Sequence, residues 1–309
     1  MYQRFLRKLK SSRTVRDVIR RVNSWAYIGR HIYRGEAGNL RISEALMSGE
    51  PQAIGKLGSG ETLAIRKYLV TKGKVDAAGR SAYYWQTSAN CIVFPASYWM
   101  YTRYCRYMLD EVLPEVTLMS VWFNHGEPGI VNRYCPNSGL VDLLALEPYQ
   151  RETPWWNALA GKRILAISPF CDTICSQHLH LTRIWAETQV MPQFTLDCVR
   201  VPYHHSLMAP KHQDWFETLH ALETEMSDKC FDIALIGASA YSLPLAVHAK
   251  KLGKQGIHLG GALQLFFGIC GRRWDHNPDV MRLMNEYWVR PLPEETPDNH
   301  LQMENGAYW

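Results

Sequence analysis

Three short segments of this chain combine glycines with hydroxyl, charged or other polar side chains, and each one follows a run of apolar residues. They are residues 56–61, 237–241 and 258–264. Glycines allow the backbone to come close to a ligand. Hydroxyl groups and the free backbone N–H groups at the start of a helix can hold a phosphate group. These residue types therefore predict a site for a phosphorylated ligand, if the fold brings the segments together.

The segment at 237–241 places hydroxyl groups directly after a glycine. Gly237 ends an apolar run, and Ser239 and Tyr241 follow in a turn before a predicted helix. In that position both hydroxyls can bind a phosphate or the sugar attached to it. A simpler role for Ser239 is to cap the helix, and the two roles are compatible.

The segment at 56–61 is predicted to be a glycine-rich turn between a strand and a helix. Gly58 and Gly60 let the backbone pass close to a ligand, and Glu61 stands at the start of the helix. A carboxylate in the first turn is favoured by the helix dipole and needs no ligand. The functional alternative is a carboxylate that holds a metal ion or a sugar hydroxyl.

Residues 231–274 predict the elements that position two of these segments. The apolar run at 232–236 is typical of a buried parallel strand. A helical segment with one apolar face follows, and a second strand begins near residue 257. Such βαβ units join parallel strands, so Gly237 and Gly260 should lie at the same edge of a sheet. In open α/β proteins, ligands bind at that edge.

The order of predicted strands and helices along the chain predicts the fold class. Strands near residues 164, 196, 232 and 257 alternate with helical segments. This pattern predicts an α/β protein with a Rossmann-like, doubly wound and mostly parallel sheet that has helices on both faces. Ser168 ends a strand as Gly237 does, and we expect it in the crevice if the strand order brings the two together.

The two ends of the chain differ from its middle. Residues 1–34 contain ten Lys or Arg against the single Asp17, a local charge of +9. We expect a basic amphipathic helical extension at 1–40, an α/β catalytic domain at 41–275 and a Pro- and Trp-rich tail at 276–309. The basic helix can bind an anionic membrane surface or simply dock on the domain. The tail can pack on the domain or form a lid over the crevice.

Composition excludes several classes of protein. With 309 residues and 47% hydrophobic side chains, the chain can bury a large core. Beyond residue 34 there are 24 basic and 28 acidic residues, which argues against a nucleic-acid partner. No apolar run approaches the ~18 residues that cross a bilayer. The scattered cysteines lack a C-x-x-C pair and favour a reduced, cytoplasmic compartment.

Several familiar motifs are missing. After Gly237 the second and third glycines of the dinucleotide fingerprint are absent, which disfavours a nicotinamide enzyme. There is no phosphate-binding Walker sequence and no G-x-S-x-G elbow. Histidine pairs at 178 and 180 and at 204 and 205 are spaced too closely to present both rings on one helical face, so a structural zinc site is disfavoured.

Three stretches of the chain, taken in order, resemble the bacterial GT-D fold glycosyltransferases of polysaccharide and glycoprotein glycosylation. The resemblance covers roughly residues 50–275 and rests on Gly-Ser-Gly-Glu at 58–61, the strand at 163–168 and the block DIALIGASAYSLPLAVHAKKLGKQGIHLGG at 232–261. In that family an Asp-x-Glu motif serves a divalent metal and the donor diphosphate. Here the Glu is Glu61, but Ser59 stands at the Asp position.

A second departure from the family is at His258, where the late strand of the family carries Asp. The resemblance implies Mn²⁺ or Mg²⁺ as a cofactor, and the loss of two carboxylates weakens that implication. Lys56, His258 or an arginine such as Arg272 or Arg273 can then carry the diphosphate charge.

The resemblance implies a glycosyltransferase that moves a sugar from a nucleotide-diphosphate donor, UDP-linked by expectation, to a glycan or lipid-linked acceptor. Glu61 would be a metal ligand, a sugar ligand or the base, and His258 is a second candidate base. The expected donor-binding residues are Lys56, Gly58, Ser59, Gly60, Ser168, Gly237, Ser239, Tyr241, Gly260, Gly261 and Gln264.

Two other functional classes stay open from the sequence. The first is a non-catalytic protein that binds nucleotide sugars or serves as a scaffold in polysaccharide assembly, which the departures at Ser59 and His258 favour. The second is an adaptor without a ligand at the inner membrane face, which only the basic residues 1–34 suggest.

Overall fold

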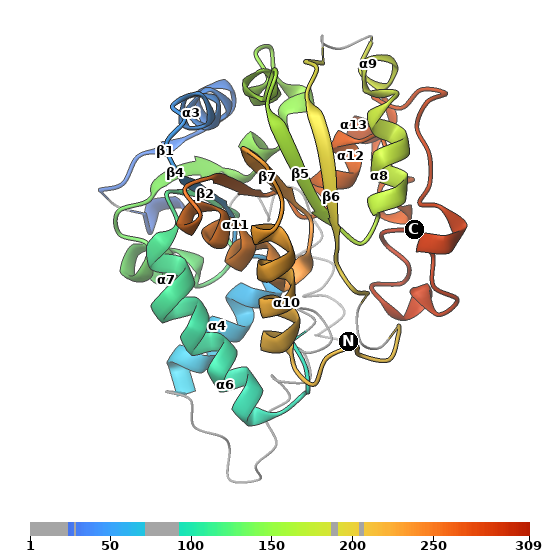
Figure 1. The fold of residues 1–309 in the computed structure, drawn as a ribbon. Coiled ribbons are helices and arrows are strands. Elements are labelled where there is room, and N and C mark those ends of the chain that lie inside the picture. The colour runs from blue at the N-terminus through green and yellow to red at the C-terminus, as the bar shows by residue number, and fades with distance from the viewer. Residues whose placement is uncertain (1–23, 28, 72–92, 187–190, 204–206) are drawn as a thin grey trace, which may run out of the picture.

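The computed structural model describes residues 24–27, 29–71, 93–186, 191–203 and 207–309. Its centre is one sheet of eight parallel strands in the order β1-β4-β3-β2-β8-β7-β5-β6 (Figure 1). The strands are β1 (Ile32–Tyr33), β2 (Gln52–Gly55), β3 (Leu118–Val121), β4 (Gly139–Asp142), β5 (Arg163–Ser168), β6 (Thr195–Arg200), β7 (Ile233–Ile236) and β8 (Gln255–His258). The chain therefore has the predicted α/β fold of Rossmann-like type.

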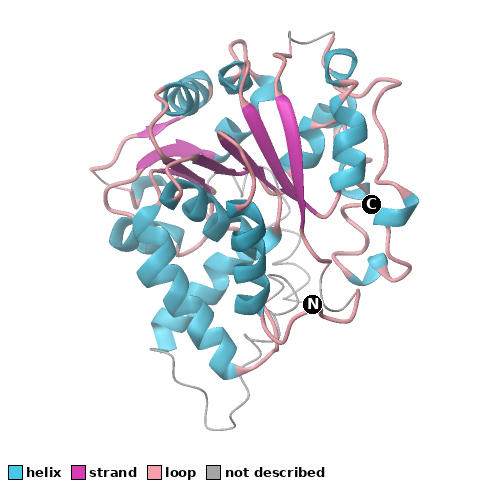
Figure 2. Cartoon of the chain, viewed as in Figure 1, coloured by secondary structure: helices cyan, strands magenta, loops and turns pink. Residues whose placement is uncertain are grey.

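Alternating side chains of the central strands build two separate cores. In β5, Leu165 and Ile167 join one hydrophobic cluster, while Ile164 and Ala166 join the other. A strand buried on both faces must be covered by helices on both, because its apolar residues point both ways. Figure 2 shows the strands enclosed by helices in this way.

The helices divide between these two cores. Buried residues of α4 (Ser59–Thr71), α6 (Tyr98–Tyr107), α7 (Glu127–Tyr134), α10 (Trp215–Ser227) and α11 (Ser242–Lys251) belong to the first cluster. Those of α3 (Glu36–Met47), α8 (Cys171–His178), α9 (Leu181–Ile184), α12 (Ala262–Phe266) and α13 (Pro278–Met281) belong to the second.

Short helical turns link the longer elements. A π-helix at Met108–Val112 continues α6, and eight 3₁₀ turns follow or precede other elements. These turns are Leu113–Glu115, Leu143–Leu146, Pro148–Gln150, Trp155–Leu159, Ser239–Tyr241, Arg272–Trp274, Pro293–Glu295 and His300–Gln302.

At two places in the sheet, the connections that follow neighbouring strands run in opposite directions along the sheet. β2 is followed by β3 on one side of it, whereas β8 lies on its other side. Likewise β5 is followed by β6 on one side, and its other neighbour β7 is followed by β8 in the opposite direction. Helices that leave two adjacent strands in opposite directions open a crevice at the carboxyl ends of those strands. Both crevices lie at the edge predicted for Gly237 and Gly260.

The N-terminal prediction requires a correction. Most of the proposed basic helix, residues 1–23 and residue 28, lies outside the described residues. Ile32 and Tyr33 are not helical but pair with Leu140 and Val141 as an edge strand. The boundary expected at residue 40 falls inside α3, which packs on the sheet. Ile32 and Tyr33 form a strand because tertiary pairing with β4 outweighs the local pattern.

The C-terminal tail lies against the α/β body beside α8 (Figure 1). In the described parts of the chain, no helix is both long enough and apolar enough to cross a membrane.

Candidate functional site

A cleft of about 620 Å³ opens at the carboxyl ends of β2 and β8. Ligand sites of proteins commonly fall in this size range, roughly 300–1,000 Å³. Nine of the residues predicted from the sequence line it: Lys56, Gly58, Ser59, Gly60, Glu61, Ser239, His258, Gly260 and Gly261. Two segments far apart in the sequence, 56–61 and 258–261, meet here because β2 and β8 are neighbours.

The turn before α4 holds Glu61 close to the backbone. A Cβ atom at position 58 would collide with the Glu61 carboxylate, so glycine at Gly58 lets that side chain keep its place. The first bond of the helix runs from the N–H of Thr62 to the carbonyl of Gly58. Burial raises the pKa of Glu61, while its own backbone N–H and Lys56 act in the opposite direction. The carboxyl is therefore poised to exchange a proton nearer to neutral pH than an exposed glutamate.

Lys56 is a cation on the wall of the cleft. Its ammonium lies 5.2 Å from the ring centre of Trp122, a cation–π contact. Burial lowers the pKa of Lys56 to about 8; Glu147 and Glu61 act against that lowering, and Arg273 adds to it. At neutral pH most molecules still carry the charge. A lysine with this pKa binds an anion strongly because little water surrounds it.

Arg273 supplies a second positive charge. Its guanidinium lies 3.8 Å from the carboxylate of Glu304 and stacks 4.9 Å from the ring centre of Tyr308. Both partners come from the C-terminal tail. Of the two arginines named from the sequence, Arg273 lines the cleft, whereas Arg272 points to the tail carbonyl of Asn305.

His258 is buried at the end of β8, with 5% of its surface exposed. Burial and the nearby charge of Lys56 lower its pKa to about 3. It is therefore neutral at physiological pH, and its Nδ1 atom has no hydrogen-bond partner among the described residues. A base with so low a pKa has little power to take a proton from a hydroxyl group. The geometry favours a hydrogen-bonding role over the predicted role of base.

A smaller inner pocket of about 100 Å³ adjoins the cleft between β5 and β7. Six predicted residues reach it: Ser168, Gly237, Ser239, Gly260, Gly261 and Gln264. The pocket shares Ser239, Gly260, Gly261 and Tyr308 with the cleft, so the two form one continuous site. Aromatic side chains of Phe170, Tyr203, Tyr308 and Trp309 give it an apolar character.

The junction between pocket and cleft is tightly built. A Cβ atom at position 237 would lie 2.9 Å from the carbonyl oxygen of Gly260, so the β7 and β8 turns touch through Gly237. Ser239 has a φ of 50°, a left-handed conformation that is unfavourable for serine. Such strain is concentrated at functional sites.

Two predicted donor-binding residues make contacts that the sequence did not indicate. Tyr241 is not in the cleft: its ring stacks on Trp215, with ring centres 4.9 Å apart, and it lines a different pocket. The 3₁₀ turn directs Ser239 toward the cleft and Tyr241 into the core. Gln264 does line the inner pocket, but its Nε2 donates to the carbonyl of Tyr308 at 2.9 Å, which leaves Oε1 without a partner.

Sequence reasoning missed several residues of the site. Glu147 follows β4, and Glu304 and Tyr308 come from the tail; all three line the cleft. Burial raises the pKa of Glu147, although Tyr149 and Lys56 act against this. A carboxylate shortly after a strand was a detectable signal for Glu147. Nothing local marks the tail residues, because only the folding of the tail brings them here.

The described side chains of the cleft do not form a recognisable site for a divalent metal ion. Mg²⁺ and Mn²⁺ prefer several oxygen ligands, carboxylates among them. Near Glu61 the positions expected to carry carboxylates hold Ser59 and His258, and Lys56 and Arg273 add positive charge. Within the described residues, no three His, Cys, Asp or Glu side chains are grouped so as to hold a metal.

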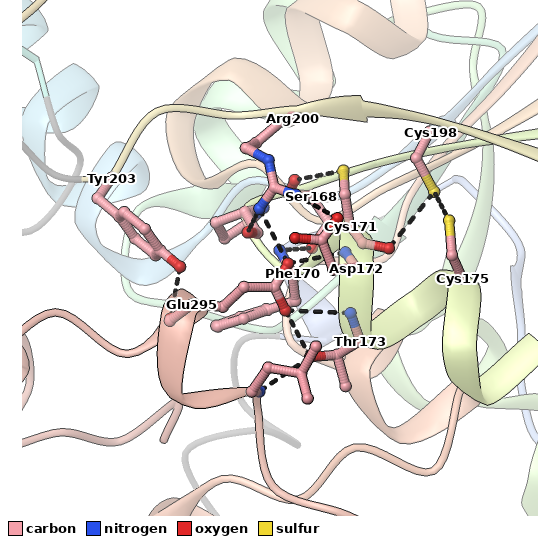
Figure 3. Close-up of polar contacts among 12 residues, drawn as sticks. Ser168, Phe170, Cys171, Asp172, Thr173, Cys175, Cys198, Arg200, Tyr203 and Glu295 are labelled. Atoms are coloured by element: carbon pink, nitrogen blue, oxygen red, sulfur yellow. Dashed lines mark hydrogen bonds and ion pairs between the residues drawn. The ribbon is translucent and has the colours of Figure 1, made fainter.

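One buried carboxylate fixes the tail against the body. Glu295, with 1% of its surface exposed, accepts hydrogen bonds from the backbone N–H groups of Asp172 and Thr173 at 2.8 and 3.1 Å (Figure 3). It also pairs with Arg200 at 2.9 Å. The N-terminus of α8 thus holds a carboxylate of the tail, as helix dipoles favour. The same tail carries Tyr308 and Trp309 into the site.

Comparison with models of known families, with curated proteins and with solved structures finds no match.

Proposed function

We propose that this chain is a glycosyltransferase that uses a nucleotide-diphosphate sugar, with UDP as the expected nucleotide. The proposed layout is a doubly wound, Rossmann-like sheet whose crevices bind the donor. The observation that carries the proposal is the pair of cations, Lys56 and Arg273, in a cleft at the carboxyl ends of β2 and β8. The start of α4 lines the same cleft, and its helix dipole also favours an anion such as a diphosphate.

In the proposed reaction an acceptor hydroxyl attacks the anomeric carbon of the sugar. The bond from that carbon to the diphosphate oxygen breaks, and the diphosphate leaves with the electron pair. Lys56 and Arg273 stabilise the developing negative charge without a metal. Glu61 accepts the proton of the acceptor, since its raised pKa suits proton transfer near neutral pH.

The inner pocket suits the apolar part of the donor. Its aromatic lining can pack against a planar base, and Gln264 Oε1 is available to a ring N–H group. His258 is neutral, so it can hydrogen-bond a sugar hydroxyl without adding charge. The ligand would then extend from the inner pocket across Gly260 to the cations.

The test has two stages. UDP, UDP-glucose, UDP-galactose and UDP-N-acetylglucosamine are first screened by thermal shift, with and without Mn²⁺. We expect stabilisation that does not depend on Mn²⁺. Release of UDP in the presence of candidate acceptors is then measured for each binding donor. Absence of any shift with all nucleotide sugars would contradict the proposal.

The second candidate is a nucleotide-sugar-binding protein without turnover. The low pKa of His258 favours it, because Glu61 is then the one predicted base that remains. Binding of a donor without release of UDP, by both the wild type and a Glu61→Gln variant, supports this reading. Loss of UDP release in Glu61→Gln with binding retained supports the transferase.

We also propose that residues 1–34 bring the protein to an anionic membrane surface that carries a lipid-linked acceptor. This proposal rests on their local charge of +9. Co-sedimentation with vesicles of phosphatidylglycerol is compared between the full chain and a chain lacking residues 1–34. Equal binding by both would remove the proposal.

A further inference from the structure

Three cysteines gather between helix α8 and the edge strand β6. The Sγ atoms of Cys175 and Cys198 lie 3.4 Å apart and face each other (Figure 3). Cys175 is exposed, Cys198 is partly exposed and Cys171 is buried. The thiol of Cys171 donates to the carbonyl of Ser168 at 3.2 Å, so it is engaged elsewhere. The pair is thus accessible from solvent, and the third thiol is not.

We propose that Cys175 and Cys198 form an oxidation site, at which hydrogen peroxide converts the two thiols into a disulfide that joins α8 to β6. This inference is independent of the proposed transferase activity. The two cysteines do not line the binding cleft or the inner pocket.

The chemistry proceeds in two steps. The more exposed Cys175 attacks one oxygen of the peroxide as its thiolate, which gives a sulfenic acid and releases water once protons are balanced. The thiolate of Cys198 then attacks the sulfenic sulfur and displaces a second water. Two thiols and one peroxide become one disulfide and two waters, so sulfur is oxidised and peroxide is reduced.

The geometry needs only a small rearrangement. A disulfide bond is about 2.05 Å long. The two sulfurs, now 3.4 Å apart, must therefore move closer together before the bond can form. Neither sulfur is held by a strong competing bond, since the contact from Cys198 to the carbonyl of Cys171 is 4.0 Å. The bridge would join residues 23 positions apart, which restricts the unfolded chain and raises stability.

Burial and nearby charges should make the reaction of these thiols with peroxide slow. Burial raises the pKa of Cys175, Cys198 acts in the opposite direction, and Cys171, Asp172 and Asp197 add to the rise. Thiolate, not thiol, is the reactive form. The site therefore differs from a fast peroxide sensor, and we expect its oxidation to require an excess of peroxide.

The test uses the full chain, reduced, freed of reductant and treated with hydrogen peroxide. Remaining thiols are alkylated with N-ethylmaleimide under denaturing conditions, and the protein is digested with trypsin and examined by mass spectrometry. We expect peptide 164–183 joined to peptide 184–200, and release of both by dithiothreitol. Because Cys171 and Cys175 share the first peptide, the Cys171→Ser variant must retain the link.

Matched variants complete the design. Cys175→Ser and Cys198→Ser should each abolish the linked peptide, while Cys230→Ser, which removes another exposed thiol, should retain it. Complete alkylation of both cysteines after peroxide, a link through Cys171, or links only between molecules would each overturn the proposal. Peptide mapping of the wild type suffices for this if a variant does not fold.

Discussion

The cleft and the inner pocket share a wall, yet they differ in character. The cleft gathers Lys56, Glu61 and Arg273 around an open space, whereas the inner pocket is lined mainly by aromatic and aliphatic side chains. A charged region beside an apolar one suits a ligand with two unlike parts. We therefore expect that substitutions can weaken ligand binding in one region alone. A substitution that disturbs the shared wall should weaken binding in both.

The largest effect is expected from the support of the shared wall. Glu295→Ala removes a buried carboxylate and leaves two N–H groups at the start of α8 without their partner, while Arg200 keeps its ion pair with Asp172. Each donor left unsatisfied in the interior costs about 1–3 kcal/mol. We expect a lower Tm in calorimetry and weaker binding at both regions. The exposed neighbour provides a matched control, and Glu294→Ala should leave both properties unchanged.

Lys56→Met should disable the cleft alone. Removing a cation that contacts a diphosphate costs about 1.5–3 kcal/mol, which is roughly a 10- to 150-fold rise in Kd. Calorimetric titration with UDP and with inorganic diphosphate should show this loss for both ligands. Lys251→Met, a change at an exposed lysine of α11, should bind as the wild type does. Unchanged diphosphate affinity in Lys56→Met would contradict the proposed role of the cleft.

Phe170→Leu should disable the inner pocket alone. The change keeps an apolar side chain but removes a ring that contacts Trp309 and lines the pocket. We expect about a 10-fold weaker affinity for UDP, since loss of a stacked aromatic costs about 1–1.5 kcal/mol. Affinity for inorganic diphosphate should be unchanged. Equal losses for the two ligands would mean that the regions do not bind separate parts.

The smallest predicted effect is a pH dependence of the cleft. Lys56 has a pKa lowered to about 8, so its positive charge is lost as pH rises through 8. Affinity for diphosphate should therefore fall about 4-fold between pH 7 and pH 8.5, and Lys56→Met should lack this fall. Stability of the ligand-free protein responds in the opposite way. The unfolded state binds the proton more tightly, so folding becomes more favourable as pH rises above 8.

The sequence predicted the parts of the site that depend on local pattern. The βαβ unit around α11 was predicted because apolar runs end at Gly237 and at Gly260, and the turn at Gly58 was predicted by its glycines. Gly58 and Gly260 line the cleft, and Gly237 lines the inner pocket beside it. Parallel strands that end at glycines can be connected in few ways. The structure contains the predicted unit, so this prediction is confirmed.

The remaining parts depend on tertiary contacts that no local pattern encodes. Strand β1 has two residues and exists through its pairing with β4. Tyr241 carries a hydroxyl in a promising segment, but packing on Trp215 takes it into the core. Glu304 and Tyr308 reach the cleft because Glu295 holds the tail against the body. The residue types of the tail do not predict this contact.

The pairing of β2 with β8 has a consequence for synthesis of the protein. Ile54 and Ile257 are partners in the sheet although they lie near opposite ends of the described chain. Contacts so distant in sequence form slowly, because a long loop must close first. During translation, Gly58 and Glu61 leave the ribosome long before His258 exists. The cleft can therefore assemble only when the chain is nearly complete, and partly synthesised molecules lack its second wall.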